Sequence, residues 1–193
     1  VQGCFLLKII RKLFKRILIM DKRIVRTRRA ILLSVLEQTK DRDIKDVRVV
    51  KVCKDAGINK STFYLHYKGI EDCVNSILEN LILSVAEFAS TINCAQVYNN
   101  PSVVVNDILN RAAADREFVE RYKSSRLAVS LTDRLQETAI NTICTNNNIQ
   151  SGTVEWARVS LIVYAVTGVM FSMDAVENRD VLFSALSDII RRA

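Results

Sequence analysis

The sequence predicts an all-α fold. Its 193 residues include one proline and five glycines, so long stretches contain nothing that interrupts a helix. Apolar residues recur every three to four positions along most of the chain, as in amphipathic helices. Alternating valines at residues 47–49 and 103–105 are short and lie beside helical periodicity, so no sheet is expected. A chain of this length can hold one small domain and one larger helical domain.

Residues 1–20 are predicted to form a basic amphipathic extension. The segment FLLKIIRKLFKRILIM places leucine and isoleucine on one side of a helix and lysine and arginine on the other. The charges interrupt each apolar run, so the segment resembles neither a membrane span nor a signal peptide. Such a helix could lie on a membrane surface or follow DNA. It could also merely cover apolar surface, or extend upstream of a native start at Met20, and these two interpretations are favoured.

Residues 21–69 are predicted to form a three-helix head. The basic stretch DKRIVRTRR leads into the first helix, and a polar loop at residues 40–45 follows it. The apolar side chains of this helix that should pack on the rest of the head are Ile31, Leu32, Val35 and Leu36. Three arginines at its start could reach phosphates or the minor groove, or be solvated at a frayed terminus, namely Arg26, Arg28 and Arg29.

The run DVRVVKVCKDAGINKSTFYLHYK, residues 46–68, predicts two short helices joined by one tight turn. Val49, Val52 and Cys53 stand at i, i+3 and i+4 and so form one apolar face of the first of them. In the turn, Gly57 suits a helix end that needs a positive φ. Asn59 suits the N-cap of the next helix.

The second of these helices combines one core anchor with many hydrogen-bond donors. Phe63 is the expected anchor, and its neighbours carry more hydroxyl, amine and imidazole groups than packing requires. In a helix-turn-helix the second helix enters the major groove and presents its first residues to base edges, while nearby side chains hold phosphates. The residues themselves therefore indicate a nucleic-acid contact.

The segment AGINKSTFYLHYKGIED resembles the recognition helix and following turn of TetR-type (TetR/AcrR) transcriptional regulators. The family pattern is roughly A-G-[VI]-[SN]-x-[GS]-T-[FL]-Y-x-[HY]-[FY]-x-[SND]-K-E, and the similarity covers about residues 27–74. Ile70 departs from it by replacing a lysine that commonly contacts a phosphate. Arg48 replaces a threonine that commonly opens the preceding helix. The matching residues are Ala56, Gly57, Ile58, Asn59, Ser61, Thr62, Phe63, Tyr64, His66, Tyr67 and Glu71.

The resemblance implies a sequence-specific DNA-binding regulator. We expect the start of the recognition helix to face the groove or its walls, and the aromatic and basic residues after it to hold the DNA backbone. Arg48 could itself reach a phosphate. The candidate DNA-binding residues are Arg48, Asn59, Lys60, Ser61, Thr62, Tyr64, His66, Tyr67 and Lys68.

Charge is distributed unevenly along the chain. Residues 1–68 hold 18 Lys and Arg against 6 Asp and Glu, a net of +12, and residues 69–193 hold 10 against 15, a net of −5. Neutralisation of phosphates dominates nonspecific DNA affinity, so only the first part is expected to meet DNA.

Residues 70–193 are predicted to form a larger helical body. Glu71 and Asp72 are acids well placed for the start of its first helix. The sequences NNPS and NNNIQSG should break the chain. Further helices are expected at residues 103–114, 116–124, 127–145, 153–173 and 180–192.

The resemblance implies a homodimer and a small-molecule effector of unknown identity. The last two helices of each subunit would pair with their counterparts, and one face of each would also serve the core of its own subunit. Twofold symmetry would then set the recognition helices ~34 Å apart on a palindromic operator. The ligand-responsive protein would act as a repressor. Aromatic residues that could line the effector pocket, or serve as plain core, are Tyr122, Trp156 and Tyr164.

The sequence argues against an enzyme. The glycines form no phosphate-binding loop, and the one histidine, His66, lies in the recognition helix, so a catalytic triad or a histidine metal site has no material. No cofactor is expected. The five cysteines show no CxxC spacing and suit reduced thiols in a cytoplasmic protein. A membrane is not the expected partner. The alternative to a DNA-binding regulator is a TetR-like interaction protein that acts through a protein partner or a membrane surface.

Overall fold

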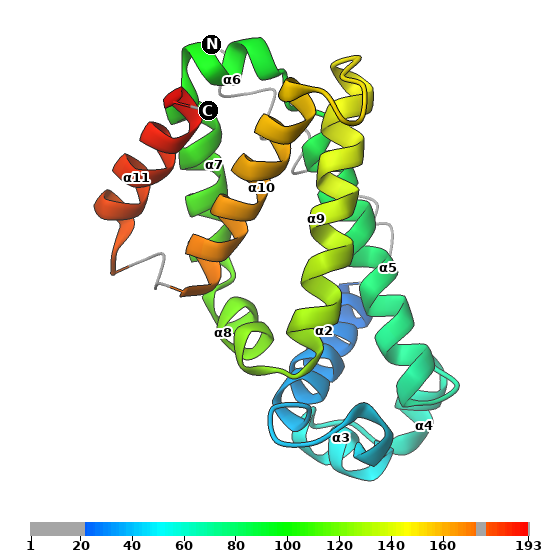
Figure 1. The fold of residues 1–193 in the computed structure, drawn as a ribbon. Coiled ribbons are helices and arrows are strands. Elements are labelled where there is room, and N and C mark those ends of the chain that lie inside the picture. Colours follow the sequence, from blue (N-terminus) through cyan, green and yellow to red (C-terminus); the bar gives the residue numbers. More distant parts are fainter. Residues whose placement is uncertain (1–21, 173–176, 193) are drawn as a thin grey trace. The chain divides into compact units, whose positions relative to one another are not determined.

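The computed structural model describes residues 22–172 and 177–192, and every regular element in them is a helix (Figure 1). The all-α prediction is confirmed for these residues. The predicted N-terminal extension lies outside them. The chain divides into two compact units within one long helix, between Glu79 and Asn80. We call the described residues up to Glu79 the head and those from Asn80 the body; the predicted boundary was ten residues earlier, after residue 69.

The head consists of one long helix, three short helical elements and the first half of a second long helix. Its elements are α2 (Lys22–Gln38), η1 (Ile44–Asp46), α3 (Val49–Asp55), α4 (Lys60–Tyr64) and the start of α5 (Ile70–Ala89). Helix α3 contacts both α2 and α4. The 3-10 helix η1 was predicted as loop, because three residues provide no periodicity.

Phe63 forms the centre of the head core, as the sequence predicts. It is fully buried, together with Ile31 and Val35 of α2 and Val52 of α3. Leu32 was expected among them but is only half-buried, whereas Leu33 is buried. The hydrophobic effect that holds α4 therefore acts mainly through one aromatic side chain, since α4 has only five residues.

The body contains the remaining helices, whose ends lie within two residues of the predicted ones, plus one helix that was not predicted. They are α6 (Cys94–Asn99), α7 (Pro101–Ala114), α8 (Arg116–Ser124), α9 (Leu127–Asn146), α10 (Val154–Ser172) and α11 (Arg179–Arg192). The unpredicted helix is α6, which starts where the Asn93 side chain accepts a hydrogen bond from the Gln96 amide at 3.0 Å. Pro101 then occupies the first turn of α7, a position where its missing N–H costs nothing.

Two buried clusters hold the body together. In one, Val105 and Leu109 of α7 pack with Leu182, Leu186 and Ile190 of α11. The other joins the end of α5 to α9 and α10 and contains Ala89, Ile140, Ile143, Cys144 and Val159. Figure 1 shows the corresponding helix pairs, α7 beside α11 and α9 beside α10. One face of α11 therefore belongs to the core of this chain, as predicted.

Asn147 connects the end of α9 to the segment between α5 and α6. Its Nδ2 donates to the Ile92 carbonyl at 2.9 Å, and its Oδ1 accepts from the Cys94 amide at 2.9 Å. The α9 terminus itself turns through Asn148, which adopts a φ of 55°. The amides of the turn are bonded as in a Schellman motif, with Ile149 N–H donating to the Cys144 carbonyl at 2.9 Å.

Replacing Asn147 with alanine should destabilise the body by about 2 kcal/mol, because two long-range hydrogen bonds at roughly 1 kcal/mol each are lost. Urea unfolding followed through Trp156 fluorescence measures this, since Trp156 is the one tryptophan and packs on the cluster beside Asn147. Asn146→Ala is the matched control, because the exposed Asn146 makes a single such bond, to the Ser90 carbonyl at 3.0 Å. Equal effects of both changes would contradict this role.

Candidate functional site

The turn between α3 and α4 has the geometry that its sequence predicts. Gly57 has a φ of 65°, and nothing lies within 4 Å of the position of a Cβ atom there. The Ile58 amide donates to the Cys53 carbonyl at 2.9 Å, and the Gly57 amide donates to the Lys54 carbonyl at 3.2 Å. These are the two bonds of a Schellman motif, in which glycine is favoured because of its backbone conformation.

Asn59 caps helix α4. Its Oδ1 accepts from the Thr62 amide at 2.7 Å, the Ser61 hydroxyl at 2.7 Å and the Thr62 hydroxyl at 2.8 Å. Asn59 was proposed for DNA contact, but this arrangement gives its side-chain oxygen a structural role. The hydroxyls of Ser61 and Thr62 have their protons directed at Asn59, so towards DNA each would act first as an acceptor.

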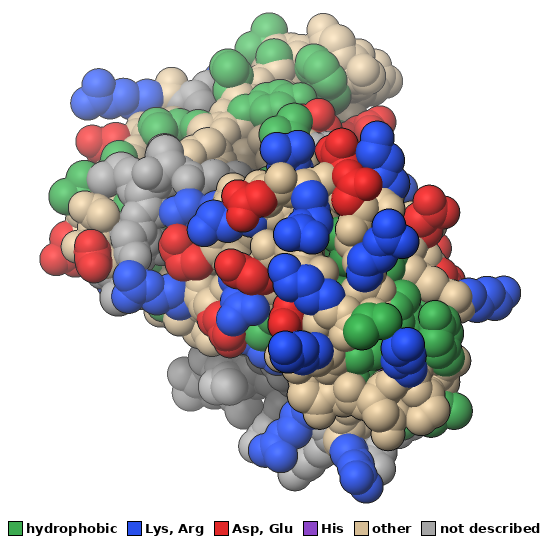
Figure 2. All heavy atoms as spheres, turned by 90° about the horizontal axis from the view of Figure 1, so that it is seen from below, with side chains coloured by type: hydrophobic (Ala, Val, Ile, Leu, Met, Phe, Trp, Pro, Cys, Tyr) green, Lys and Arg blue, Asp and Glu red, His purple; other side chains and the backbone are tan. Residues whose placement is uncertain are grey.

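Most of the predicted DNA-binding residues lie at the surface of the head. Figure 2 shows one face of the molecule, on which Lys and Arg side chains lie with acidic side chains among them. Thr62 and His66 are half-buried. The exposed members of the set are Arg48, Asn59, Lys60, Ser61, Tyr64 and Lys68.

Tyr67 is the exception. Only 4% of its surface is exposed, and its ring lies 5.6 Å from that of Phe63. Burial raises the pKa of the Tyr67 hydroxyl to about 12, so it remains protonated. The predicted backbone contact of Tyr67 is at odds with this burial, and we assign the side chain to the head core. In the sequence, Tyr67 lies between His66 and Lys68, which suggested a surface position, although it also stands four residues after the core anchor Phe63.

His66 is half-buried at the surface of the head. Partial burial, helped by the positive charge of Arg28, lowers the pKa of His66, so the imidazole is neutral at pH 7. A neutral imidazole can still donate one hydrogen bond to a phosphate oxygen. It would add no positive charge to the surface at that pH.

Arg48 precedes α3 and Lys68 follows α4, so they flank the α3–turn–α4 unit. The backbone N–H of Lys68 donates to Asp72 Oδ2 at 2.7 Å, which ties the start of α5 and leaves the Lys68 side chain exposed. Arg48 is the N-cap of α3 but makes no side-chain cap bond, since a guanidinium has no acceptor. The departure from the family pattern at Arg48 thus leaves α3 without a side-chain cap.

Arg48→Ser should stabilise the head by about 1 kcal/mol, because serine can accept a hydrogen bond from an amide of the first turn of α3. Hydrogen exchange of the α3 amides measures the change. Arg48→Ala is the control: it removes the same charge without supplying a cap, so it should bring no gain. A phosphate contact by Arg48 would appear separately, as an equal loss of DNA affinity in both variants.

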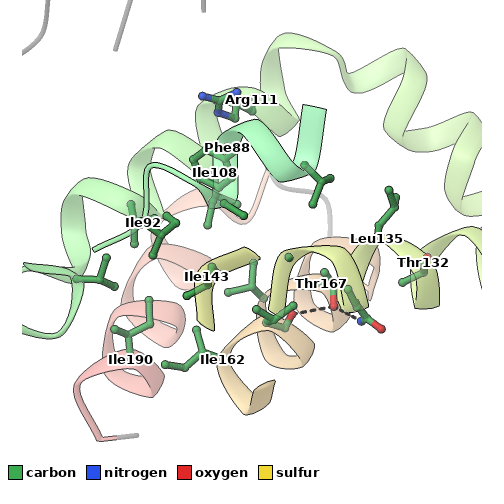
Figure 3. A pocket seen from close by; sticks show the side chains of 18 residues that line it. Phe88, Ile92, Ile108, Arg111, Thr132, Leu135, Ile143, Ile162, Thr167 and Ile190 are labelled. Atoms are coloured by element: carbon green, nitrogen blue, oxygen red, sulfur yellow. Dashed lines mark hydrogen bonds between the residues drawn. The ribbon is translucent and has the colours of Figure 1, made fainter. Parts of the chain in front are cut away.

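The body encloses a cavity of about 300 Å³ (Figure 3). Fourteen of its 18 lining side chains are apolar. They come from α5, α6, α7, α9, α10 and α11 and from the segment after α5. The four polar lining residues are Arg111, Thr132, Gln136 and Thr167. A largely apolar cavity with a few polar groups is the usual form of a small-molecule site.

None of the three aromatic residues proposed for effector binding lines this cavity. Tyr122 is buried, and its hydroxyl lies 3.0 Å from Thr132 Oγ1 and donates to the Ala128 carbonyl at 3.3 Å. Trp156 packs on the α5–α9–α10 cluster, and Tyr164 is 54% exposed. The residues that do line the cavity were missed because their apolar spacing equals that of an ordinary helix core. One signal was present: Arg111 shares a helix face with apolar Ile108 at i−3.

No family model matches this chain. A search of the curated proteins finds no match either. The resemblance to TetR-type regulators therefore depends on the motif at residues 56–71 and on local geometry. None of the described helices has the length and apolar character needed to cross a membrane.

Proposed function

We propose that this protein is a sequence-specific DNA-binding transcriptional regulator of the TetR type. The observation that carries the proposal is the α3–turn–α4 unit. In it Gly57 ends one helix, Asn59 caps the next, and Phe63 anchors a recognition helix whose other side chains are mostly polar and exposed. A helix held by a single buried anchor leaves its remaining faces available to the major groove.

We further propose a homodimer through α10 and α11. Helix α10 exposes Leu161 and Tyr164, and helix α11 exposes Val181. Exposed apolar side chains on two adjacent helices are typical of a subunit interface. A twofold axis would present two heads to a palindromic operator.

The body cavity is the proposed effector site. It lies entirely within the body and is lined from all of that unit's helices except α8. A ligand that fits one arrangement of these helices better than another would shift the population between DNA-binding and non-binding states. This regulation would make the protein a ligand-responsive repressor.

Binding of the full chain to a fluorescent duplex of mixed sequence provides a first test. Affinity should fall steeply from 50 to 200 mM salt, because phosphate contacts release counterions. A chain starting at Met20 serves as the control for the basic extension, and it should bind with the same site preference. Absence of binding by both chains at 50 mM salt would overturn the proposal.

A further inference from the structure

We infer that the cavity of the body binds an apolar acid of about twelve non-hydrogen atoms, with its carboxylate on Arg111. The inference rests on the proposed function only for its regulatory consequence. The size follows from the cavity volume of about 300 Å³. A 150 Å³ apolar cavity accommodates benzene, with six carbon atoms, so twice that volume suits roughly twelve atoms.

Arg111 is held in a fixed position at the edge of the cavity. Its Nε donates to Asp107 Oδ2 at 2.8 Å, one turn earlier on α7. Its guanidinium lies over the Phe88 ring, 4.6 Å from the ring centroid. An arginine whose Nε is hydrogen-bonded and whose guanidinium plane is stacked on an aromatic ring loses little further conformational entropy when a ligand binds.

The rest of the guanidinium is suited to a carboxylate. Among the described residues, Asp107 is the one hydrogen-bond acceptor on Arg111, and it engages Nε. The two Nη groups form the end of the planar fork, which a carboxylate can engage with both oxygens. Arg111 is also the one charged side chain among the described residues that line the cavity.

The other polar side chains of the lining already have hydrogen-bond partners within the body, and Thr132 Oγ1 lies 3.0 Å from the Tyr122 hydroxyl. Gln136 Nε2 donates to Thr167 Oγ1, and the Thr167 hydroxyl donates to the Val163 carbonyl at 2.9 Å. Figure 3 shows Thr167 on the far side of the drawn lining from Arg111, with Phe88 and Ile108 next to Arg111. A ligand with its acid at Arg111 would therefore lay its tail along an apolar wall.

Asp107 has two opposing effects on the affinity of the cavity for an acid. Its carboxylate orients Arg111, but it also repels an incoming anion and offsets part of the arginine charge. Arg111 is 34% exposed at its side chain, so solvent weakens the pairing further. We therefore expect a preference of about tenfold for the acid over a neutral analogue, rather than a hundredfold.

Calorimetric titration of the full chain with decanoate, decan-1-ol and decylamine tests the inference. Decanoate should bind about tenfold more tightly than decanol, and decylamine more weakly than both. Arg111→Gln should lower decanoate affinity to the level of decanol and leave decanol affinity unchanged. Asp107→Asn should raise decanoate affinity. If Arg111→Gln does not fold, Arg111→Lys replaces it and should give an intermediate affinity, because lysine keeps the charge without the fork.

Equal binding of decanoate and decanol, or no binding of either, would overturn the inference. So would an equal loss of both affinities in the arginine variant. DNA binding without ligand is measured separately. Ligand binding without DNA binding would exclude the proposed DNA-binding function and support the acid-binding cavity. DNA binding without ligand binding would support the DNA-binding function and exclude the acid-binding cavity. If both hold, decanoate should lower DNA affinity in the wild type and not in Arg111→Gln.

Discussion

Leu161→Glu should convert the proposed homodimer to a monomer. Leu161 is 66% exposed in the single chain and lies on the face of α10 that also carries Ala157, Tyr164 and Gly168, all exposed. In a twofold interface the substitution acts twice. Each leucine lost from the interface removes about 1.5–3 kcal/mol of apolar burial, and each glutamate adds the cost of a desolvated charge.

Sedimentation velocity measures the change in mass. Val129→Glu is the matched control, because Val129 is 75% exposed and lies on α9, outside the proposed interface. It should remain a dimer. Dissociation by Val129→Glu but not by Leu161→Glu would move the interface away from α10. A wild-type chain that is monomeric at micromolar concentration would contradict the proposed homodimer.

Lys68→Ala should weaken DNA binding to all sequences alike and reduce its salt dependence. Each contact between a lysine and a phosphate contributes about 0.9 to the slope of log K against log salt. A dimer loses two such contacts, so the slope should fall by about 1.8. The start of α5 should be unaffected, since Lys68 is bonded to Asp72 there through its backbone N–H.

Fluorescence anisotropy over a range of salt concentrations provides the slope. Lys40→Ala is the control, because Lys40 is an exposed lysine of the head that lies outside the α3–turn–α4 unit. Its slope should stay close to that of the wild type. Tyr64→Ala should also lower affinity, whereas Tyr64→Phe distinguishes the hydroxyl from the ring, which is 56% exposed and packs edge-on against Phe63. Unchanged DNA binding in both Lys68→Ala and Tyr64→Ala would exclude this face of the head as the DNA-binding surface.

The turn between α3 and α4 could be predicted because its signals are local. Gly57 and Asn59 specify the turn and the cap through their own backbone and side-chain chemistry, and Phe63 is the one large apolar residue available to anchor α4. Tyr67 could not be assigned in this way. His66 and Lys68 flank it in the sequence and suggest a surface position, whereas its buried ring packs against Phe63, four residues earlier.

The helices of the body could be predicted from the sequence, but its cavity could not. Helix ends follow from caps and breakers, so they were close, whereas the cavity depends on how the apolar faces of several helices fail to fill the space between them. Val104 and Ile108 look like core residues in sequence and line the cavity in the structure. Arg111 on their side of α7 was the one local sign of a site.

Selection of bound duplexes from a random DNA pool tests the central claim most directly. The full chain should enrich one palindromic sequence, with half-sites about one helical turn or a related spacing apart, and Lys60→Ala should change the preferred bases without abolishing binding. Enrichment of no sequence, or of a single half-site without symmetry, would contradict a dimeric sequence-specific regulator.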